Sequence, residues 1–176
     1  METPRLTLLP CQPEHLRAIL EGPAAFESTL GLRLAEGLAD FFRMASPEWL
    51  ARVQAGLMDD PWWLGYWMLH KADRAVMGTC GYKGPPDPEG MVEIAYGVAP
   101  GYQNHGYATE AAAALVAFAL RHTEIHTIRA HTLAESNAST KVLTRCGFSK
   151  LGEVIDPEDG LVWRWEQQRP SPKTAW

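Results

Sequence analysis

The chain has 176 residues, of which 46% are hydrophobic and 21% are charged, and its formal net charge is -5 at pH 7. This length and composition suffice for one hydrophobic core, so we expect a single domain over residues 1–168 and a flexible tail over residues 169–176. The acidic balance without a basic cluster argues against nucleic acid as a partner. No apolar run has the roughly 18 residues of a membrane span. Residues 1–9 carry Arg5 in place of a signal-peptide pattern, which predicts a cytoplasmic protein without membrane contact.

The cysteines and histidines predict neither a disulfide framework nor a metal site. Cys11, Cys80 and Cys146 are odd in number, far apart and set among apolar residues. Disulfide frameworks and zinc sites use paired, closely spaced cysteines, so we expect reduced thiols in the core. The histidines between residues 122 and 131 have no recognisable metal-ligand spacing, and no metal is expected.

The first third of the chain predicts one strand followed by helices. A strand over residues 5–9 is followed by apolar residues at helical spacing over residues 13–20. A second amphipathic helix is predicted over residues 34–44. A serine cap and a proline predict a third helix from residue 47 to about residue 57. This region is rich in aromatic residues, and Trp49 is the one we select for a test of substrate contact.

The rest of the chain predicts alternating strands and helices. Period-two patterns at residues 63–70 and 75–83 around a polar turn indicate an antiparallel hairpin. A loop rich in proline and glycine at residues 84–90 leads to a strand. The later elements that we expect are a strand at 91–98, a helix at 108–120, a strand at 127–133, a helix at 136–145 capped near Gly147, and strands at 149–154 and 161–166.

The segment from Met91 to Leu120 is the main functional feature of the sequence. It combines an apolar strand, a glycine-bearing loop at residues 101–108 and an alanine-rich helix with Glu110 in its first turn. Backbone N–H groups of such a loop, together with the unpaired donors and the dipole of the helix N-terminus, bind anions. The segment therefore predicts a cradle that fits a pyrophosphate.

The residues of this loop resemble a known motif. Gln103, Gly106 and Ala108, preceded by Val98-Ala99-Pro100, resemble the acetyl-coenzyme A motif of the GCN5-related N-acetyltransferases (GNAT), Q/R-x-x-G-x-G/A between a strand and a helix. Three further segments resemble the ribosomal-protein branch of that family, the RimJ/RimL-like members. They are Arg5 to Pro10, Glu93 to Val98, and Ala134 to Ser139 leading to Cys146-Gly147-Phe148.

The resemblance covers nearly the whole chain, and it implies an α/β (α+β) fold of the GNAT type. Such a fold has a mixed, mostly antiparallel sheet flanked by helices, and the predicted elements supply about seven strands for it. The co-substrate implied is acetyl-coenzyme A, with its pantetheine arm along the strand that ends at Val98. The expected coenzyme-binding residues are Val98, Ala99, Gln103, Asn104, His105, Gly106, Tyr107, Ala108, Thr109 and Asn137.

The family mechanism implies direct attack of an amine on the thioester, which requires a base. Glu93, on the strand before the motif, is the first candidate, and Glu135 or water alone are the alternatives. For the oxyanion, the family uses a backbone N–H group, here that of Val98 or Ala99.

The acid that protonates the departing thiolate is where the sequence departs from the family. Many relatives have a tyrosine in the helix before the final Gly-Phe, but Leu143 stands at that position. Ser139 matches a serine of the RimJ/RimL-like branch and is the candidate donor, with a capping role at the helix N-terminus as the alternative. Ser136 replaces the usual asparagine of the branch, and Asn137 follows it.

The sequence thus predicts an N-acetyltransferase that acts on a primary amine, either a protein N-terminus or a small molecule. The alternative is a non-catalytic module that binds or senses acyl-coenzyme A, because the usual tyrosine is absent. The acceptor and the acyl-chain preference are not identified, and a homodimer is left open beside a monomer.

Overall fold

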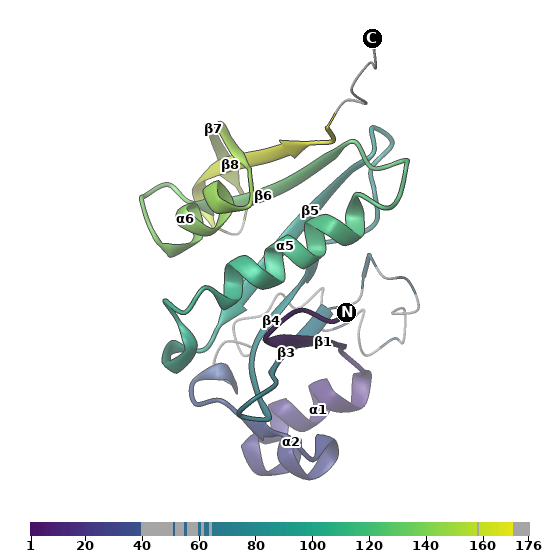
Figure 1. Cartoon of the computed structure of the whole chain (residues 1–176), viewed down its shortest axis with the longest axis vertical. Helices are drawn as coiled ribbons and strands as arrows, with labels where there is room; N and C mark the ends of the chain where they lie inside the picture. The colour runs from purple at the N-terminus through teal and green to yellow at the C-terminus, as the bar shows by residue number, and fades with distance from the viewer. Residues whose placement is uncertain are drawn as a thin grey trace.

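The computed structural model forms one mixed sheet with helices packed against it (Figure 1). The predicted α/β fold with a mostly antiparallel sheet is confirmed. None of the helices in the described part of the chain is long and apolar enough to cross a bilayer. The residues that the structure describes are 1–39, 65–157 and 159–170, together with Ala51, Ala55, Asp60, Trp62 and Trp63.

Within these residues the sheet has eight strands, one more than the sequence predicts. The strands are β1 Leu6–Pro10, β2 Arg33–Leu34, β3 Gly65–His70, β4 Ala75–Tyr82, β5 Met91–Val98, β6 Thr127–Leu133, β7 Ser149–Asp156 and β8 Gly160–Gln168. The helices are α1 Pro13–Glu21, α2 Pro23–Leu30, α5 Tyr107–Ala119 and α6 Ala138–Arg145, with a short 3-10 helix, η1, at Pro100–Tyr102.

The strands follow the order β1–β3–β4–β5–β6–β8–β7, and β2 pairs with β4 outside this path. The predicted hairpin of β3 and β4 is antiparallel and joins Gly65 to Gly81 at its far end. Two pairs are parallel, β2 with β4 and β5 with β6. The sheet is therefore mixed, as expected.

The predicted helix over residues 34–44 is wrong at its start. Leu34 lies in β2, where it pairs with Val76 of β4, and its side chain is buried. An unpredicted helix, α2, precedes it and ends at Gly31, whose φ of 66° is left-handed. Pairing with β4 thus outweighs the helical spacing of this segment.

The remainder of that predicted helix, beyond residue 39, lies outside the described residues. So does most of the predicted helix over residues 47–57, including Trp49. Its two described residues, Ala51 and Ala55, are joined by a backbone hydrogen bond of 3.0 Å from the Ala55 N–H to the Ala51 carbonyl.

Helices cover both faces of the sheet because side chains alternate along each strand. On one face, His70 of β3 contacts Tyr107 of α5, and the Tyr82 hydroxyl of β4 donates to a carbonyl of α5. On the other face, Trp67 of β3 packs edge-on against Phe26 of α2, with ring centroids 5.2 Å apart. The fully buried side chains between these layers include Trp67, Phe26, Leu8, Met68, Leu115 and Leu143.

The central strand β5 changes partners along its length. Its first three residues pair in parallel with Thr127 to Arg129 of β6. From Ile94 to Val98 it pairs with β4, while β6 pairs with β8 along its whole length. The two central strands therefore diverge after Glu93, and the outer half of β5 has one open edge.

Gly90 fixes the paired end of these two strands. Its carbonyl accepts hydrogen bonds from the N–H groups of His126 and Thr127, at 2.8 and 3.2 Å, just before β6 begins. Its φ of +74° is left-handed, and a Cβ there would lie 2.2 Å from the carbonyl oxygen of Glu124. Only glycine meets both conditions at this position.

The substitution Gly90→Ala is expected to lower the free energy of unfolding by about 2 kcal/mol, from backbone strain and the clash. Urea denaturation followed by circular dichroism measures it. Gly152→Ala is the control, because a Cβ at Gly152 meets no atom within 4 Å. Equal urea midpoints for Gly90→Ala and the wild type contradict the role given to Gly90.

Candidate functional site

A cavity of about 460 Å³ lies between the outer half of β5, the loop that follows it, α5 and α6. Its walls combine an apolar strand end with a glycine loop and one face of a helix. The lining residues are Tyr96, Gly97, Val98, Tyr102, Gln103, Asn104, Gly106, Tyr107, Ala108, Thr109, Ala138, Ser139, Lys141, Val142 and Arg145. Of the ten expected coenzyme-binding residues, seven line this cavity.

The loop and the first turn of α5 carry hydrogen-bond donors without acceptors. Within the described residues, the backbone N–H groups of residues 104–109 donate to no protein atom, and the first to do so is Glu110, to the Gly106 carbonyl at 3.0 Å. The hydroxyl oxygen of Thr109 is buried and has no partner in the same part of the chain. Such unsatisfied donors, with the helix dipole behind them, fit an anion.

Gly106 sets the shape of this cradle. It caps α5 with a φ of +81°, and a Cβ on it would meet nothing closer than 3.5 Å, at an Arg5 guanidinium nitrogen. The left-handed backbone, and not lack of space, therefore selects glycine at this position. Gln103 closes the loop, because its side-chain amide donates to the Val98 carbonyl at 3.0 Å.

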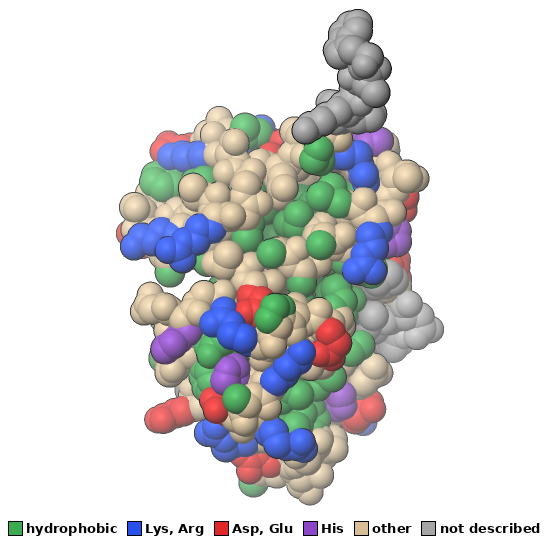
Figure 2. All heavy atoms as spheres, in the orientation of Figure 1, with side chains coloured by type: hydrophobic (Ala, Val, Ile, Leu, Met, Phe, Trp, Pro, Cys, Tyr) green, Lys and Arg blue, Asp and Glu red, His purple; other side chains and the backbone are tan. Residues whose placement is uncertain are grey.

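Two cations of α6, Lys141 and Arg145, complete the wall opposite the loop. Figure 2 shows Lys and Arg side chains gathered over α6 at the edge of the molecule. Neither residue is among those predicted from the sequence. Their spacing of four, with Ala138 three residues before Lys141, places them on one helix face and is the signal that could find them. Their charge favours a polyanionic ligand.

The open edge of β5 favours Val98 over Ala99 as an oxyanion donor. The Ala99 N–H donates to the carbonyl of Met77 in β4 at 2.8 Å, so it is already used, and Ala99 is buried outside the cavity wall. Successive N–H groups of a strand point to opposite edges. The Val98 N–H therefore points away from β4, toward the side that β6 leaves open.

The expected base, Glu93, lies outside the cavity wall, on the opposite face of β5 from Tyr96. One carboxylate oxygen, Oε1, is 2.7 Å from the Lys83 ammonium and 2.9 Å from Nδ1 of His131, and the side chain is 17% exposed. Oε2 makes no hydrogen bond or ion pair within the described residues. The alternative, Glu135, is exposed in the loop after β6.

Of the other predicted site residues, some line the cavity and some lie outside its wall. Ser139 lines the cavity, whereas Asn137 does not, because its side-chain oxygen caps α6 by accepting the Thr140 N–H at 3.1 Å. His105 is exposed outside the wall, with its ring on the Gln103 carbonyl. Leu143, at the position of the usual tyrosine, is fully buried. Tyr96 and Tyr102 are lining residues that the sequence analysis misses.

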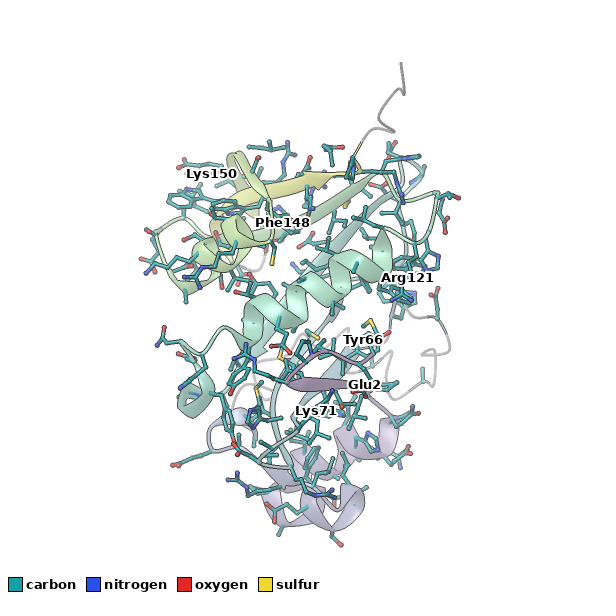
Figure 3. All side chains as sticks on the ribbon, viewed as in Figure 1. Glu2, Tyr66, Lys71, Arg121, Phe148 and Lys150 are labelled. Carbon is teal, nitrogen blue, oxygen red and sulfur yellow. The ribbon has the colours of Figure 1, made fainter. Side chains whose placement is uncertain are left out.

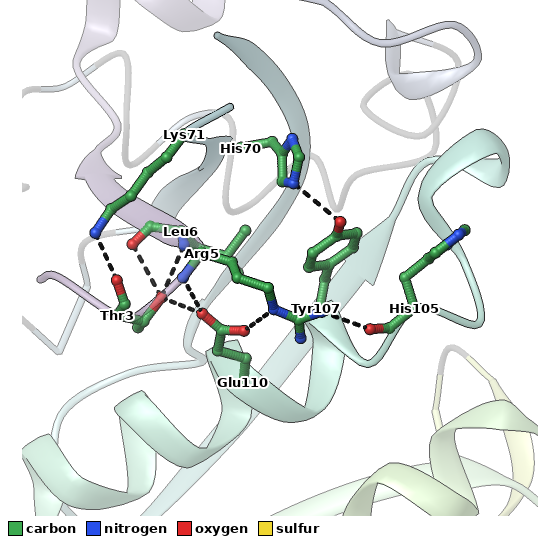
Figure 4. Close-up of polar contacts among 8 residues, drawn as sticks. All are labelled: Thr3, Arg5, Leu6, His70, Lys71, His105, Tyr107 and Glu110. Atoms are coloured by element: carbon green, nitrogen blue, oxygen red, sulfur yellow. Dashed lines mark hydrogen bonds and ion pairs between the residues drawn. The ribbon is translucent and has the colours of Figure 1, made fainter. Parts of the chain in front are cut away.

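The cradle is fixed to the N-terminal segment before β1, residues 1–5, through Glu110 (Figure 4). Its carboxylate accepts from the Thr3 hydroxyl at 2.6 Å and from the backbone N–H and Nε of Arg5, each at 2.7 Å. The same Arg5 guanidinium donates to the His105 carbonyl at 2.9 Å and stacks over the Tyr107 ring. Burial raises the pKa of Glu110, but the hydrogen bonds from Thr3 and Arg5 outweigh it and hold that pKa below its usual value.

Three further contacts hold the segments around the cradle. The Tyr107 hydroxyl is 2.9 Å from Nε2 of His70, whose other ring nitrogen is 3.0 Å from Asp73. Figure 3 shows Lys71 beside Glu2, and their ion pair measures 2.8 Å. The segment before β1 is therefore bound to the β3–β4 turn as well as to α5.

The family model of the acetyltransferase (GNAT) domain matches residues 5–149. The chain belongs to this family. It is 32% identical over 83 residues to the uncharacterized N-acetyltransferase YjdG of Bacillus subtilis (strain 168), which covers 47% of this chain and 49% of that relative. The match thus spans about half the length of this curated relative.

Solved GNAT structures have the same fold at low sequence identity. Ribosomal-protein-S5-alanine acetyltransferase from Vibrio fischeri superposes with a TM-score of 0.68 and 18% identity over 96% of each chain. The acetyltransferase AAC(6')-Ib in complex with ribostamycin and coenzyme A gives a TM-score of 0.65 and 15% identity over 94% of each chain. Among the residues that the structure describes, no group of three or more His, Cys, Asp or Glu side chains is placed to hold a metal ion.

Because of the contacts of Glu110, we expect part of the free energy of unfolding to depend on pH. The carboxyl pKa of Glu110 is lower in the folded state than in the unfolded state, so its ionised side chain stabilises the fold at pH values above the unfolded pKa of about 4.3. This stabilisation is lost as the pH falls through the folded pKa. Glu110→Gln should therefore be less stable than the wild type at neutral pH and should lose less stability on acidification. Urea unfolding over a pH series measures both, with Glu36→Gln, at an exposed position, as the control. Parallel pH profiles for Glu110→Gln and the wild type contradict the assignment.

Proposed function

We propose that this protein transfers an acetyl group from acetyl-coenzyme A to a primary amine. The observation that carries the proposal is the cavity, which joins unsatisfied backbone donors at residues 104–109 to an apolar strand end with an open edge. Coenzyme A has the matching parts, a pyrophosphate followed by an amide-bearing arm and a thiol. Membership of the GNAT family supports the same ligand.

The residues present fit this co-substrate at both ends. The N–H groups of the loop and the orphan Thr109 hydroxyl would hold the pyrophosphate, with Lys141 and Arg145 adding positive charge. The open edge of β5 would pair with the amides of the arm, since alternate backbone groups in this half of the strand point away from β4. Acetyl-coenzyme A supplies the acyl group as a thioester.

In the reaction we propose, the amine nitrogen attacks the thioester carbonyl and forms the new amide bond. Glu93 accepts the proton of the amine, directly or through water, and its Oε2 is the oxygen left available by Lys83 and His131. Because β5 and β6 no longer pair after Glu93, the amine would approach the thioester between these two strands, from the face of β5 that carries Glu93. The Val98 N–H stabilises the oxyanion until the C–S bond breaks.

The thiolate that leaves takes up one proton, for which Ser139 is the donor expected from the sequence. It lines the cavity at the first turn of α6. Since Asn137 provides the cap of that helix, the Ser139 hydroxyl is not needed for capping.

For the acceptor, we propose membership of the RimJ/RimL-like branch, with the α-amine of a peptide as the first substrate class to test. The three sequence segments that resemble this branch support it, as does the likeness to the S5-alanine acetyltransferase. A small-molecule amine is the second candidate. It is favoured by the comparable likeness to the aminoglycoside acetyltransferase AAC(6')-Ib, whose structure contains ribostamycin. The fold does not choose between them.

The experiment is a thiol-release assay with acetyl-coenzyme A over peptides with free N-termini, polyamines and aminoglycosides. Saturable release with at least one class is expected, and the same peptides with acetylated N-termini are the controls. Coenzyme A binding without release over the whole panel contradicts the enzyme and indicates a non-catalytic module.

The substitution Glu93→Gln should lower kcat/KM by about 100-fold at neutral pH, because an α-amine with a pKa near 8, and still more an alkylamine near 10, is then mostly charged and has no base. The loss should shrink as the pH rises and the free amine becomes abundant. Glu89→Gln, on the exposed loop before β5, is the matched control. Unchanged turnover of Glu93→Gln at neutral pH removes the role of this residue.

A further inference from the structure

We propose that the phenol of Tyr96 is the proton donor to the departing coenzyme A thiolate, a role that the sequence analysis gives to Ser139. This inference rests on the proposed function. The cavity wall contains three tyrosines, Tyr96, Tyr102 and Tyr107, whose hydroxyls have different hydrogen-bond partners.

Two of these hydroxyls are held outside the cavity. The Tyr107 hydroxyl is 2.9 Å from Nε2 of His70, and the Tyr102 hydroxyl donates to Asp73 at 2.9 Å. The Tyr96 hydroxyl instead makes a long bond of 3.4 Å to the backbone carbonyl of Ser139. A bond of that length is weak, so the Tyr96 phenol can exchange it for a better acceptor.

Tyr96 also lies at the end of the cavity where the thiol belongs. Of the two α6 cations in the cavity wall, Lys141 lies two residues and Arg145 six residues after Ser139, and the helix rises about 1.5 Å per residue. Arg145 is therefore about 9 Å along the helix from Ser139. Tyr96 precedes the end of β5 that leads into the cradle, and its hydroxyl contacts Ser139. A ligand with its pyrophosphate at the cradle and its arm along β5 thus has its far end beside these two residues.

The chemistry favours a phenol over a serine hydroxyl. As the C–S bond breaks, the electron pair remains on sulfur, and the Tyr96 O–H bond gives up its proton to form the S–H bond. The resulting phenolate then takes a proton from water. An unperturbed phenol has a pKa near 10, far below that of an aliphatic alcohol, so Tyr96 stays the stronger acid of the two candidates even when burial raises its pKa.

The surroundings keep this phenol protonated until it is needed. Burial raises the pKa of Tyr96, with a smaller contribution from Cys146, whose own pKa burial also raises. The same burial disfavours a thiolate anion in the cavity, so sulfur is a strong proton acceptor at that point.

The test compares Tyr96→Phe with Ser139→Ala in the thiol-release assay, after the wild type has been shown to be active. Tyr96→Phe keeps the ring in the wall and should lower kcat by about 100-fold, the scale of general acid catalysis. Its Kd for coenzyme A, from calorimetry, should stay near that of the wild type. Tyr66→Phe is the control and should leave kcat unchanged, because it removes the hydroxyl of a buried tyrosine on β3 that does not line the cavity (Figure 3).

A second measurement separates proton donation from packing. Fluorinated tyrosines at position 96 lower the phenol pKa stepwise without removing the ring, and the basic limb of the kcat profile should move down in pH with them. A limb that does not move overturns the inference, as does unchanged kcat in Tyr96→Phe. A larger loss in Ser139→Ala than in Tyr96→Phe overturns it in favour of the serine. No release by the wild type itself is a different result, because it overturns the proposed function first.

Discussion

The short pairing between β5 and β6 is the constraint on which the rest of the site depends. Three residues of β5 pair with β6, and beyond Glu93 the strands separate because β6 stays with β8 while β5 stays with β4. A strand with one open edge keeps unpaired backbone groups, which attract a ligand that can add to the sheet. The loop and α5 then follow directly from the end of β5, so the anion cradle lies in line with this edge.

The divergence also places different chemistry on the two faces of β5. Toward α5 and α6, the wall is aromatic and apolar, with hydroxyls at Tyr96 and Ser139 and cations further along α6. On the opposite face, Glu93 is held by Lys83 and His131. An acyl transfer needs a proton removed from the amine and another given to the thiolate. Groups on opposite faces of one strand can serve these two needs without neutralising each other.

Local patterns predict the strands β5 and β6 with their observed bounds, because alternation leaves a mark in the sequence itself. They also predict the glycine-bearing loop before α5, in which Gly106 caps the helix. The strand β2 is not predicted, since its two residues take their conformation from pairing with β4. Lys141 and Arg145 are not predicted, because in the sequence they are typical of a solvent-exposed helix face and only the fold places α6 across the cavity from the loop. The contact of His131 with Glu93 joins residues 38 apart, beyond any local signal.

Amide hydrogen exchange at residues 104–109, measured with and without coenzyme A, tests the central claim most directly. These N–H groups lack acceptors in the described structure, so they should exchange fast in the free protein. Coenzyme A should slow their exchange, together with that of the Val98 N–H on the open edge of β5. Binding of coenzyme A that leaves these amides unprotected, or no binding at all, would contradict the account.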